Sequence, residues 1–229
     1  MYNKYSKSPH SSARICKDIN IMEEIMVFER EFAEWNDFWW EKAGDFSCTR
    51  ILLIGDSITK SYRRRVQEIF RPERIAVDQL CGSRCAGDPV LTAELDLATG
   101  PLTGYRYDII HFNNGLHGGC NDTHIPLSVY EKGIADIISV LRNNQPEAKL
   151  ILATTTPMVK ADNPAAGDFV RERNAFLRRF AKENCFSIND LYALTADSSA
   201  FPQTDTVHFE KSAAEKLGDH VAEYIRKFL

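Results

Sequence analysis

Ile51-Leu52-Leu53-Ile54-Gly55-Asp56-Ser57 is the stretch that best predicts the fold, an aliphatic run that ends in a glycine and two polar residues. Four consecutive aliphatic residues that stop at a glycine are typical of a buried strand. Residues 59–70 then have helical spacing, so the chain should turn sharply at Ser57 from a strand into a helix. A strand, a turn and a helix in this order predict one unit of an α/β sheet.

The same alternation continues along the chain. We expect strands at residues 50–54, 74–80, 107–112, 149–153 and 185–188, and helices at residues 59–70, 127–143, 169–183 and 211–228. Strands that alternate with helices indicate a parallel sheet with helices on both faces, whose ligand sites lie at the carboxyl ends of the strands. The predicted fold class is therefore α/β, a flavodoxin-like three-layer α/β/α arrangement with a parallel five-stranded sheet.

The part of the chain ahead of this alternation has a different composition. Residues 18–42 combine helical spacing with many aromatic side chains, and they follow a serine-rich start. We therefore expect residues 1–47 to form a loose segment and an aromatic-rich helical extension, and residues 48–229 to form a single main domain. The aromatic helix should pack against the sheet or against a second subunit, as in a homodimer, and a lid over the substrate is the alternative.

Composition narrows the class of protein. The chain has 229 residues, 44% hydrophobic and 26% charged, which suits one globular domain, and its net charge of −4 gives no reason to expect a nucleic-acid partner. It contains no apolar stretch long enough to span a membrane. Residues 1–20 are polar and lack the apolar core of a secretory signal, so a cytoplasmic location is expected. The six scattered cysteines show no metal-ligand spacing, and we predict no metal site.

Ser57 acquires a chemical partner at the other end of the chain. Asp205-Thr206-Val207-His208 places a carboxylate and an imidazole three residues apart, close enough to meet on one turn. A serine hydroxyl becomes a strong nucleophile when an imidazole takes its proton and a carboxylate orients that imidazole. An Asp-Ser pair ahead of a helix is also an ordinary helix cap, which is the alternative interpretation. We predict that Ser57, Asp205 and His208 are catalytic.

These two blocks resemble those of the SGNH, or GDSL, hydrolase family, and the resemblance extends from about residue 50 to residue 229. The family has four blocks, of which Gly-Asp-Ser and Asp-x-x-His are intact in this chain. Leu80-Cys81-Gly82 is similar to the second, Asn-x-Gly, with Gly82 on the glycine. The third block departs from Gly-x-Asn-Asp: aligning its glycine with Gly115 puts His117 on the asparagine, whereas a shifted alignment puts Asn113 there. We favour His117, because the phrase His-Phe-Asn-x-Gly-Leu-His at residues 111–117 resembles a bacterial branch of the family.

The resemblance implies an esterase that works through an acyl-enzyme intermediate and needs no metal or organic cofactor. It also implies an oxyanion hole that includes Gly82 and either His117 or Asn113. The expected substrate is a small-molecule ester with a small acyl group, or an acetylated carbohydrate. An acyltransferase, a lysophospholipase-type acylhydrolase using the same three residues, and a non-catalytic binding protein on the same fold remain alternatives.

Overall fold

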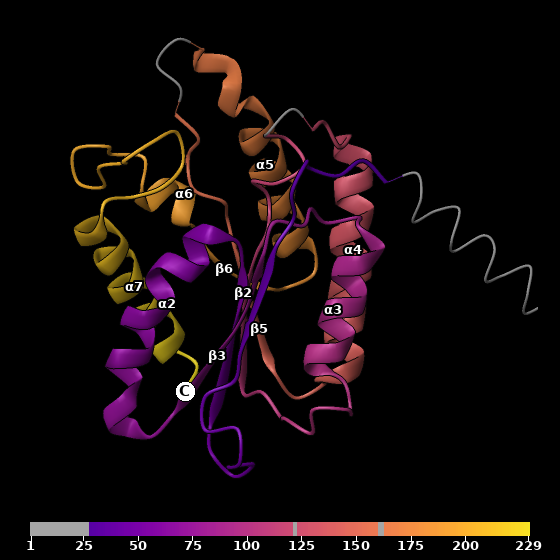
Figure 1. The fold of residues 1–229 in the computed structure, drawn as a ribbon, viewed down its shortest axis with the longest axis vertical. Coiled ribbons are helices and arrows are strands. Elements are labelled where there is room, and N and C mark those ends of the chain that lie inside the picture. Colours follow the sequence, from indigo (N-terminus) through magenta and orange to yellow (C-terminus); the bar gives the residue numbers. More distant parts are fainter. Residues whose placement is uncertain (1–27, 121–122, 160–162) are drawn as a thin grey trace, which may run out of the picture.

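The computed structural model describes residues 28–120, 123–159 and 163–229. Figure 1 shows three layers, with a central sheet between two groups of helices. The strands are β1 (Asn36–Trp39), β2 (Arg50–Gly55), β3 (Ala76–Gly82), β4 (Ile109–Asn113), β5 (Lys149–Ala153) and β6 (Ser187–Asn189). The helices are α2 (Ser57–Phe70), α3 (Pro89–Thr99), α4 (Leu127–Asn144), α5 (Asp168–Glu183), α6 (Leu191–Leu194) and α7 (Lys211–Arg226), with 3-10 turns η1 (Arg71–Glu73) and η2 (Pro164–Gly167). The predicted three-layer α/β/α fold is confirmed.

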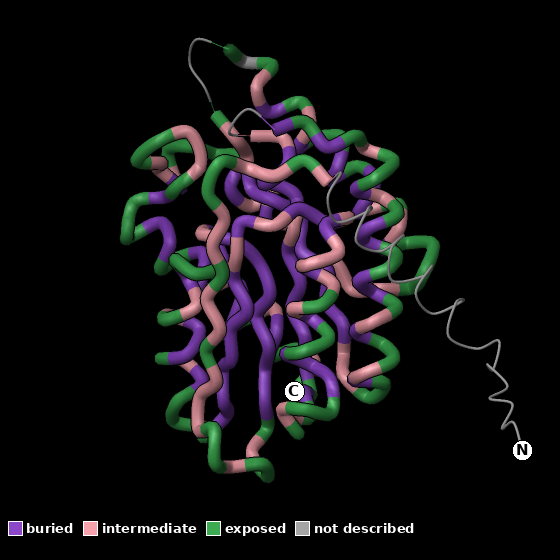
Figure 2. Tube along the Cα trace, turned by 45° about the vertical axis from the view of Figure 1, so that its right-hand side comes forward, coloured by how far each residue is buried: buried purple, intermediate pink, exposed green. Residues whose placement is uncertain are grey.

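The strand order is β1-β3-β2-β4-β5-β6, and β2 to β6 are parallel. All six residues of β2 are buried, because helices cover both faces of this central strand. Ile51 and Leu53 point to one face and pack with α2 and α7, whereas Leu52 and Ile54 point to the other and pack with α3, α4 and α5. Figure 2 shows the resulting buried interior between exposed helix faces. None of the described helices has the length and apolar character needed to cross a bilayer.

The prediction of an aromatic-rich helix over residues 18–42 is wrong for residues 28–42, the part of this range that the structure describes. Residues 18–27 lie outside the described part, but Asn36–Trp39 forms β1, which pairs antiparallel with β3 at the edge of the sheet. Aromatic residues favour strands, and an unpaired edge offers the backbone hydrogen bonds that a strand needs. The sheet therefore has a sixth strand, which the sequence pattern had assigned to a helix.

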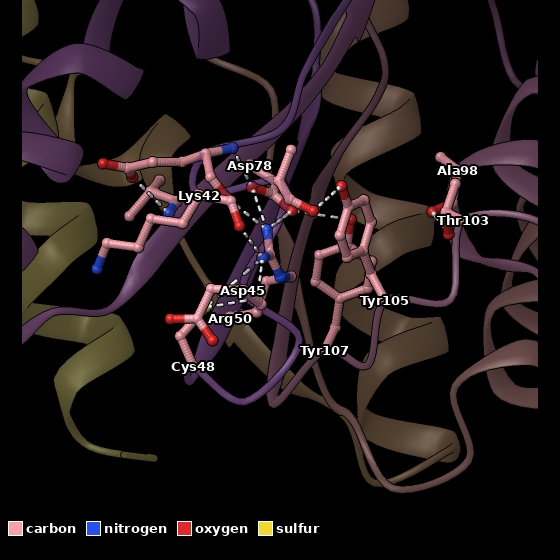
Figure 3. A network of polar contacts seen from close by, with 12 residues as sticks. Lys42, Asp45, Cys48, Arg50, Asp78, Ala98, Thr103, Tyr105 and Tyr107 are labelled. Carbon is pink, nitrogen blue, oxygen red and sulfur yellow. Dashed lines mark hydrogen bonds and ion pairs between the residues drawn. The ribbon is translucent and has the colours of Figure 1, made fainter.

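At the end of the sheet where β2 begins, a buried ion pair joins two neighbouring strands. Arg50 is 1% exposed, and its Nη1 donates to both carboxylate oxygens of Asp78, at 2.9 and 2.8 Å. Tyr107 donates its hydroxyl to the same carboxylate at 3.0 Å, and the Tyr105 ring lies 4.2 Å from the guanidinium (Figure 3). Nη2 of Arg50 donates to the carbonyls of Lys42 and Asp45, at 3.2 and 3.0 Å, so this arginine also fixes the turn between β1 and β2.

Replacing Asp78 with alanine should destabilise the protein by about 3–5 kcal/mol, because the change leaves the Arg50 guanidinium and the Tyr107 hydroxyl buried without the carboxylate. Urea denaturation measures the free energy of unfolding. Glu68→Ala is the matched control, since Glu68 pairs with Arg64 at 3.2 Å on the surface and should contribute less than about 1 kcal/mol. Equal losses in the two variants would contradict a special role for the buried pair.

Candidate active site

Ser57 lies on the turn that joins β2 to α2. The carboxylate of Asp56 accepts a hydrogen bond from the backbone N–H of Ile58 at 2.9 Å and so caps α2, leaving Ser57 as the first residue of the helix. Gly55 permits the sharp turn, because a Cβ on it would lie 2.0 Å from the Thr59 hydroxyl oxygen. The cap and the predicted nucleophile are therefore adjacent residues, and the helix N-terminus favours negative charge near Ser57.

His208 and Asp205 lie in the loop before α7 and complete the arrangement. Ser57 Oγ donates to His208 Nε2 at 2.9 Å, across a sequence separation of 151 residues. His208 Nδ1 donates to Asp205 Oδ2 at 2.8 Å. The three predicted side chains thus form one hydrogen-bonded relay in the order that serine catalysis requires.

The backbone orients Asp205 within this loop. Its Oδ1 accepts the N–H groups of Val207 and His208, both at 2.8 Å. These backbone hydrogen bonds, followed by the side-chain bond to His208, hold the pKa of Asp205 down at about 2. Asp205 is therefore a carboxylate at neutral pH, and it can accept the hydrogen bond from His208 Nδ1.

Gly82 ends β3 beside the segment that precedes β1. A Cβ at Gly82 would lie 2.9 Å from the carbonyl oxygen of Trp35, so a larger residue would displace that segment. Ser83 N donates to the same carbonyl at 3.0 Å, and Trp35 N donates to Ser83 Oγ at 2.9 Å. The loop that follows Gly82 is thus pinned by residues the sequence pattern had placed in a helix.

The amide of Asn113 is already engaged. Asn113 is 4% exposed, and its Nδ2 donates to the carbonyls of Ala153 and Thr154, at 3.1 and 3.0 Å. An amide nitrogen has two hydrogens, and both are used here to join the ends of β4 and β5. Asn113 therefore holds neighbouring strands together in this structure.

His117 lies farther along the same loop and has one ring nitrogen without a partner. Its Nδ1 is 2.7 Å from Glu31 Oε1, while its buried Nε2 makes no hydrogen bond among the described residues. Burial disfavours the charged ring, but hydrogen bonds with Cys120 and Glu31 and the charge of Asp56 outweigh it and raise the pKa of His117 to about 10. His117 is therefore an imidazolium at neutral pH.

Glu31, His117 and Cys120 place three potential metal-ligand atoms within 4.8 Å of one another. Two ligands bound tetrahedrally to Zn²⁺ at about 2.0–2.1 Å would be about 3.3 Å apart. The 2.7 Å between His117 Nδ1 and Glu31 Oε1 is shorter than that and is the length of a charge-assisted hydrogen bond. As they lie, these residues form a hydrogen-bonded pair with a neighbouring thiol.

Arg173 of α5, which sequence analysis did not identify, holds the loop that carries His117. Its guanidinium donates to the carbonyls of Gly115 and His117 through Nη1, at 3.0 and 2.7 Å, and to those of Gly118 and Ile125 through Nη2, at 2.8 and 3.3 Å. Arg173 is 2% exposed. One buried cation thus fixes the backbone on both sides of His117, and one of four arginines in an amphipathic helix gives no sequence signal of this role.

Replacing Arg173 with methionine should lower the free energy of unfolding by about 3 kcal/mol or more, because four loop carbonyls lose a charged donor. It should also reduce catalytic turnover through displacement of His117. Thermal or urea denaturation and steady-state kinetics measure the two effects. Arg179→Met is the control on the same helix, since Arg179 is exposed and forms an ion pair with Glu131 at 3.4 Å. Wild-type stability of Arg173→Met would show that the loop holds its shape without this clamp.

Comparison with known proteins gives a result for the fold alone. No protein-family model matches the sequence, and no curated protein matches it. Among solved structures, a GDSL-like lipase from Bacteroides thetaiotaomicron is similar with a TM-score of 0.62 and 15% identity, covering 92% of this chain and 98% of that chain. A lipase/acylhydrolase from Enterococcus faecalis has a TM-score of 0.64 and 18% identity, covering 78% and 96%.

An acetyl xylan esterase, AlAXEase, is also similar, with a TM-score of 0.58, 18% identity, and coverage of 77% of this chain and 99% of that chain. Identities of 15–18% show a shared fold and nothing more specific. The chain therefore has the fold of GDSL-like lipases, acylhydrolases and acetyl xylan esterases, as its Gly-Asp-Ser and Asp-x-x-His blocks predicted.

Proposed function

We propose that this chain is a serine esterase that hydrolyses small acyl or carbohydrate acetyl esters through an acyl-enzyme. The observation that carries the proposal is the relay from Ser57 through His208 to Asp205, at 2.9 and 2.8 Å. A nucleophile, a base and an orienting carboxylate in hydrogen-bond contact are the parts that acyl transfer to serine needs. The resemblance in fold to an acetyl xylan esterase and to acylhydrolases supports the choice of esters as substrates.

The chemistry follows from the proton positions. His208 Nε2 takes the proton of Ser57 as Oγ attacks the ester carbonyl and forms a new C–O bond. The tetrahedral intermediate collapses when the bond to the alcohol breaks, and His208 returns its proton to that leaving oxygen. Water then attacks the acyl-enzyme, with His208 again acting as base, and the acid is released as the bond to Ser57 breaks. Asp205 keeps its charge throughout and stabilises the imidazolium.

The openness of the site favours hydrolysis over transfer to a second alcohol. The side chains of His208 and Asp205 are 46% and 52% exposed, so water can reach the base. An acyltransferase must exclude water from its acyl-enzyme, and nothing in these exposures provides for that. We infer that water is the acceptor, and that small, water-soluble esters are the substrates.

Donors for the oxyanion are proposed from the geometry of two loops. The backbone N–H groups of Ser57 and Gly82 lie at the ends of neighbouring strands, and His117 has an unpartnered ring nitrogen in the next loop. Asn113, the alternative third donor, has both amide hydrogens on carbonyl oxygens. We therefore assign the third donor to His117.

Ser57→Ala and His208→Ala should each reduce ester turnover about 10⁴-fold or more, because either change removes the nucleophile or its base. The assay uses aryl esters of two to twelve acyl carbons and a panel of acetylated sugars. Ser61→Ala is the control, since Ser61 lies one turn along α2 and its hydroxyl bonds only the carbonyl of Ile58. Wild-type turnover by Ser57→Ala would refute the assignment, and ester formation with added alcohols or sugars in place of free acid would establish an acyltransferase.

His117→Ala should lower kcat about 100-fold or more with little change in KM, since an oxyanion donor acts mainly in the transition state. Asn113→Ala should instead lower the free energy of unfolding by about 1–3 kcal/mol, because two strand-end carbonyls lose their donor, and change kcat much less. Kinetics well below the melting temperature, together with urea denaturation, separate the two effects. The reverse pattern would transfer the donor role to Asn113.

A further inference from the structure

The contact between Glu31 and His117 joins residues 86 positions apart, on either side of β1, β2, β3 and β4. The side chains are 7% and 10% exposed, so the pair is shielded from water. At 2.7 Å, the distance between Glu31 Oε1 and His117 Nδ1 is that of a charge-assisted hydrogen bond. Cys120 Sγ also lies 3.7 Å from this carboxylate oxygen. A shielded pair of this kind fixes where the protons of the ring lie.

A carboxylate can only accept, so Nδ1 of His117 must carry a hydrogen. In a neutral ring the other nitrogen, Nε2, would then have a lone pair and no hydrogen, and it would repel an oxyanion. Only the doubly protonated ring offers an Nε2–H that can stabilise negative charge. His117 can therefore serve as the third donor only as a cation, and the carboxylate at Nδ1 is one of the groups that favour that form.

The other groups around His117 act in the same direction or are neutral toward it. Asp56, next to the nucleophile, and Cys120 both favour the cation. Arg173 donates to the backbone carbonyl of His117 at 2.7 Å and not to its ring. Nε2 is buried and has no partner among the described residues, so no described group competes for a hydrogen on it.

Residues on both sides of Glu31 in the sequence form ion pairs that anchor its segment. Arg30 donates to Asp88 at 2.8 and 3.1 Å, and Glu34 pairs with Arg84. Asp88 and Arg84 lie in the loop between β3 and α3, which begins at Gly82. The segment that carries Glu31 is therefore anchored to the same loop that carries a proposed oxyanion donor.

We propose that Glu31 is a positioning residue of the oxyanion hole, which keeps His117 protonated on both ring nitrogens so that Nε2–H can bind the oxyanion. The inference rests on the proposed esterase function. It assigns a catalytic task to the segment ahead of the sheet, and it makes the third oxyanion donor a buried cation. A charged donor on a buried ring stabilises a developing oxyanion more strongly than a neutral one.

The kinetic test compares Glu31→Gln with Glu31→Asp. Glu31→Gln removes the charge that favours the cation, so His117 should be neutral at pH 8 and kcat should fall about 100-fold there. In the wild type, His117 should lose its proton, and activity should decline, only as the pH rises toward about 10. Glu31→Asp keeps the charge and should retain most of kcat. Glu29→Gln is the matched control, because Glu29 is an exposed glutamate two residues away.

His117→Gln provides a second background, because glutamine is a neutral donor that does not titrate. If Glu31 acts only through His117, adding Glu31→Gln to His117→Gln should change kcat less than threefold, although the same change costs about 100-fold in the wild type. A full additional loss in the double variant would overturn the proposal, since it would show a role for Glu31 that does not pass through the ring.

Nitrogen-15 NMR of the histidine rings tests the protonation state without any substrate. The His117 ring should carry both protons up to about pH 9 in the wild type and in Ser57→Ala, and should be neutral at pH 8 in Glu31→Gln. A neutral wild-type ring at pH 8 would overturn this inference while the esterase proposal stood. Wild-type turnover by Ser57→Ala would instead overturn the esterase proposal and, with it, the catalytic task of Glu31.

Discussion

Parallel pairing of β2 with β3 and β4 is the constraint on which the site depends. The register places Gly55 opposite Cys81 and Ile54 opposite Phe112, so the carboxyl ends of all three strands lie side by side. The loops that follow these strands therefore lie close together, and side chains from distant parts of the sequence can meet there. The burial of every residue of β2 on both faces makes a register shift costly, which fixes the position of Ser57 relative to the neighbouring loops.

The parts that sequence analysis predicted well are those with strong local patterns. The aliphatic run before Gly55 predicted β2, and the spacing between Asp205 and His208 predicted their contact. Helices with clear amphipathic spacing, such as α5 and α7, were also predicted. The helix α3 was missed, because its apolar residues do not form a regular stripe, and Asp88 as its cap became evident only in the structure. In the regions that were predicted correctly, local pattern and tertiary packing agree, which is why a single sequence sufficed.

Interactions that depend on tertiary packing could not be predicted in the same way. The segment that forms β1 has aromatic residues at helical spacing, yet the edge of β3 and the loop after Gly82 determine its conformation. Likewise the sequence leaves Asn113 open beside the favoured His117, and the carbonyls of Ala153 and Thr154 that engage the Asn113 amide become evident only in the structure. Neither the Arg173 contacts nor the Glu31 contact leaves a trace in the spacing of residues, because each joins segments that are distant along the chain.

The two ends of the sheet use buried charge for different purposes. Near the start of β2, Arg50 is surrounded by a carboxylate, backbone carbonyls and an aromatic ring, so every charge is satisfied within the protein. At the opposite end, the His117 ring is paired on one nitrogen, and its other, buried nitrogen has no partner among the described residues. Burying a charge is costly even when it is paired, so a half-satisfied cation is a poor way to stabilise a fold. Its cost is understandable if the missing partner is the oxyanion of a reacting ester, whose charge exists only during the reaction.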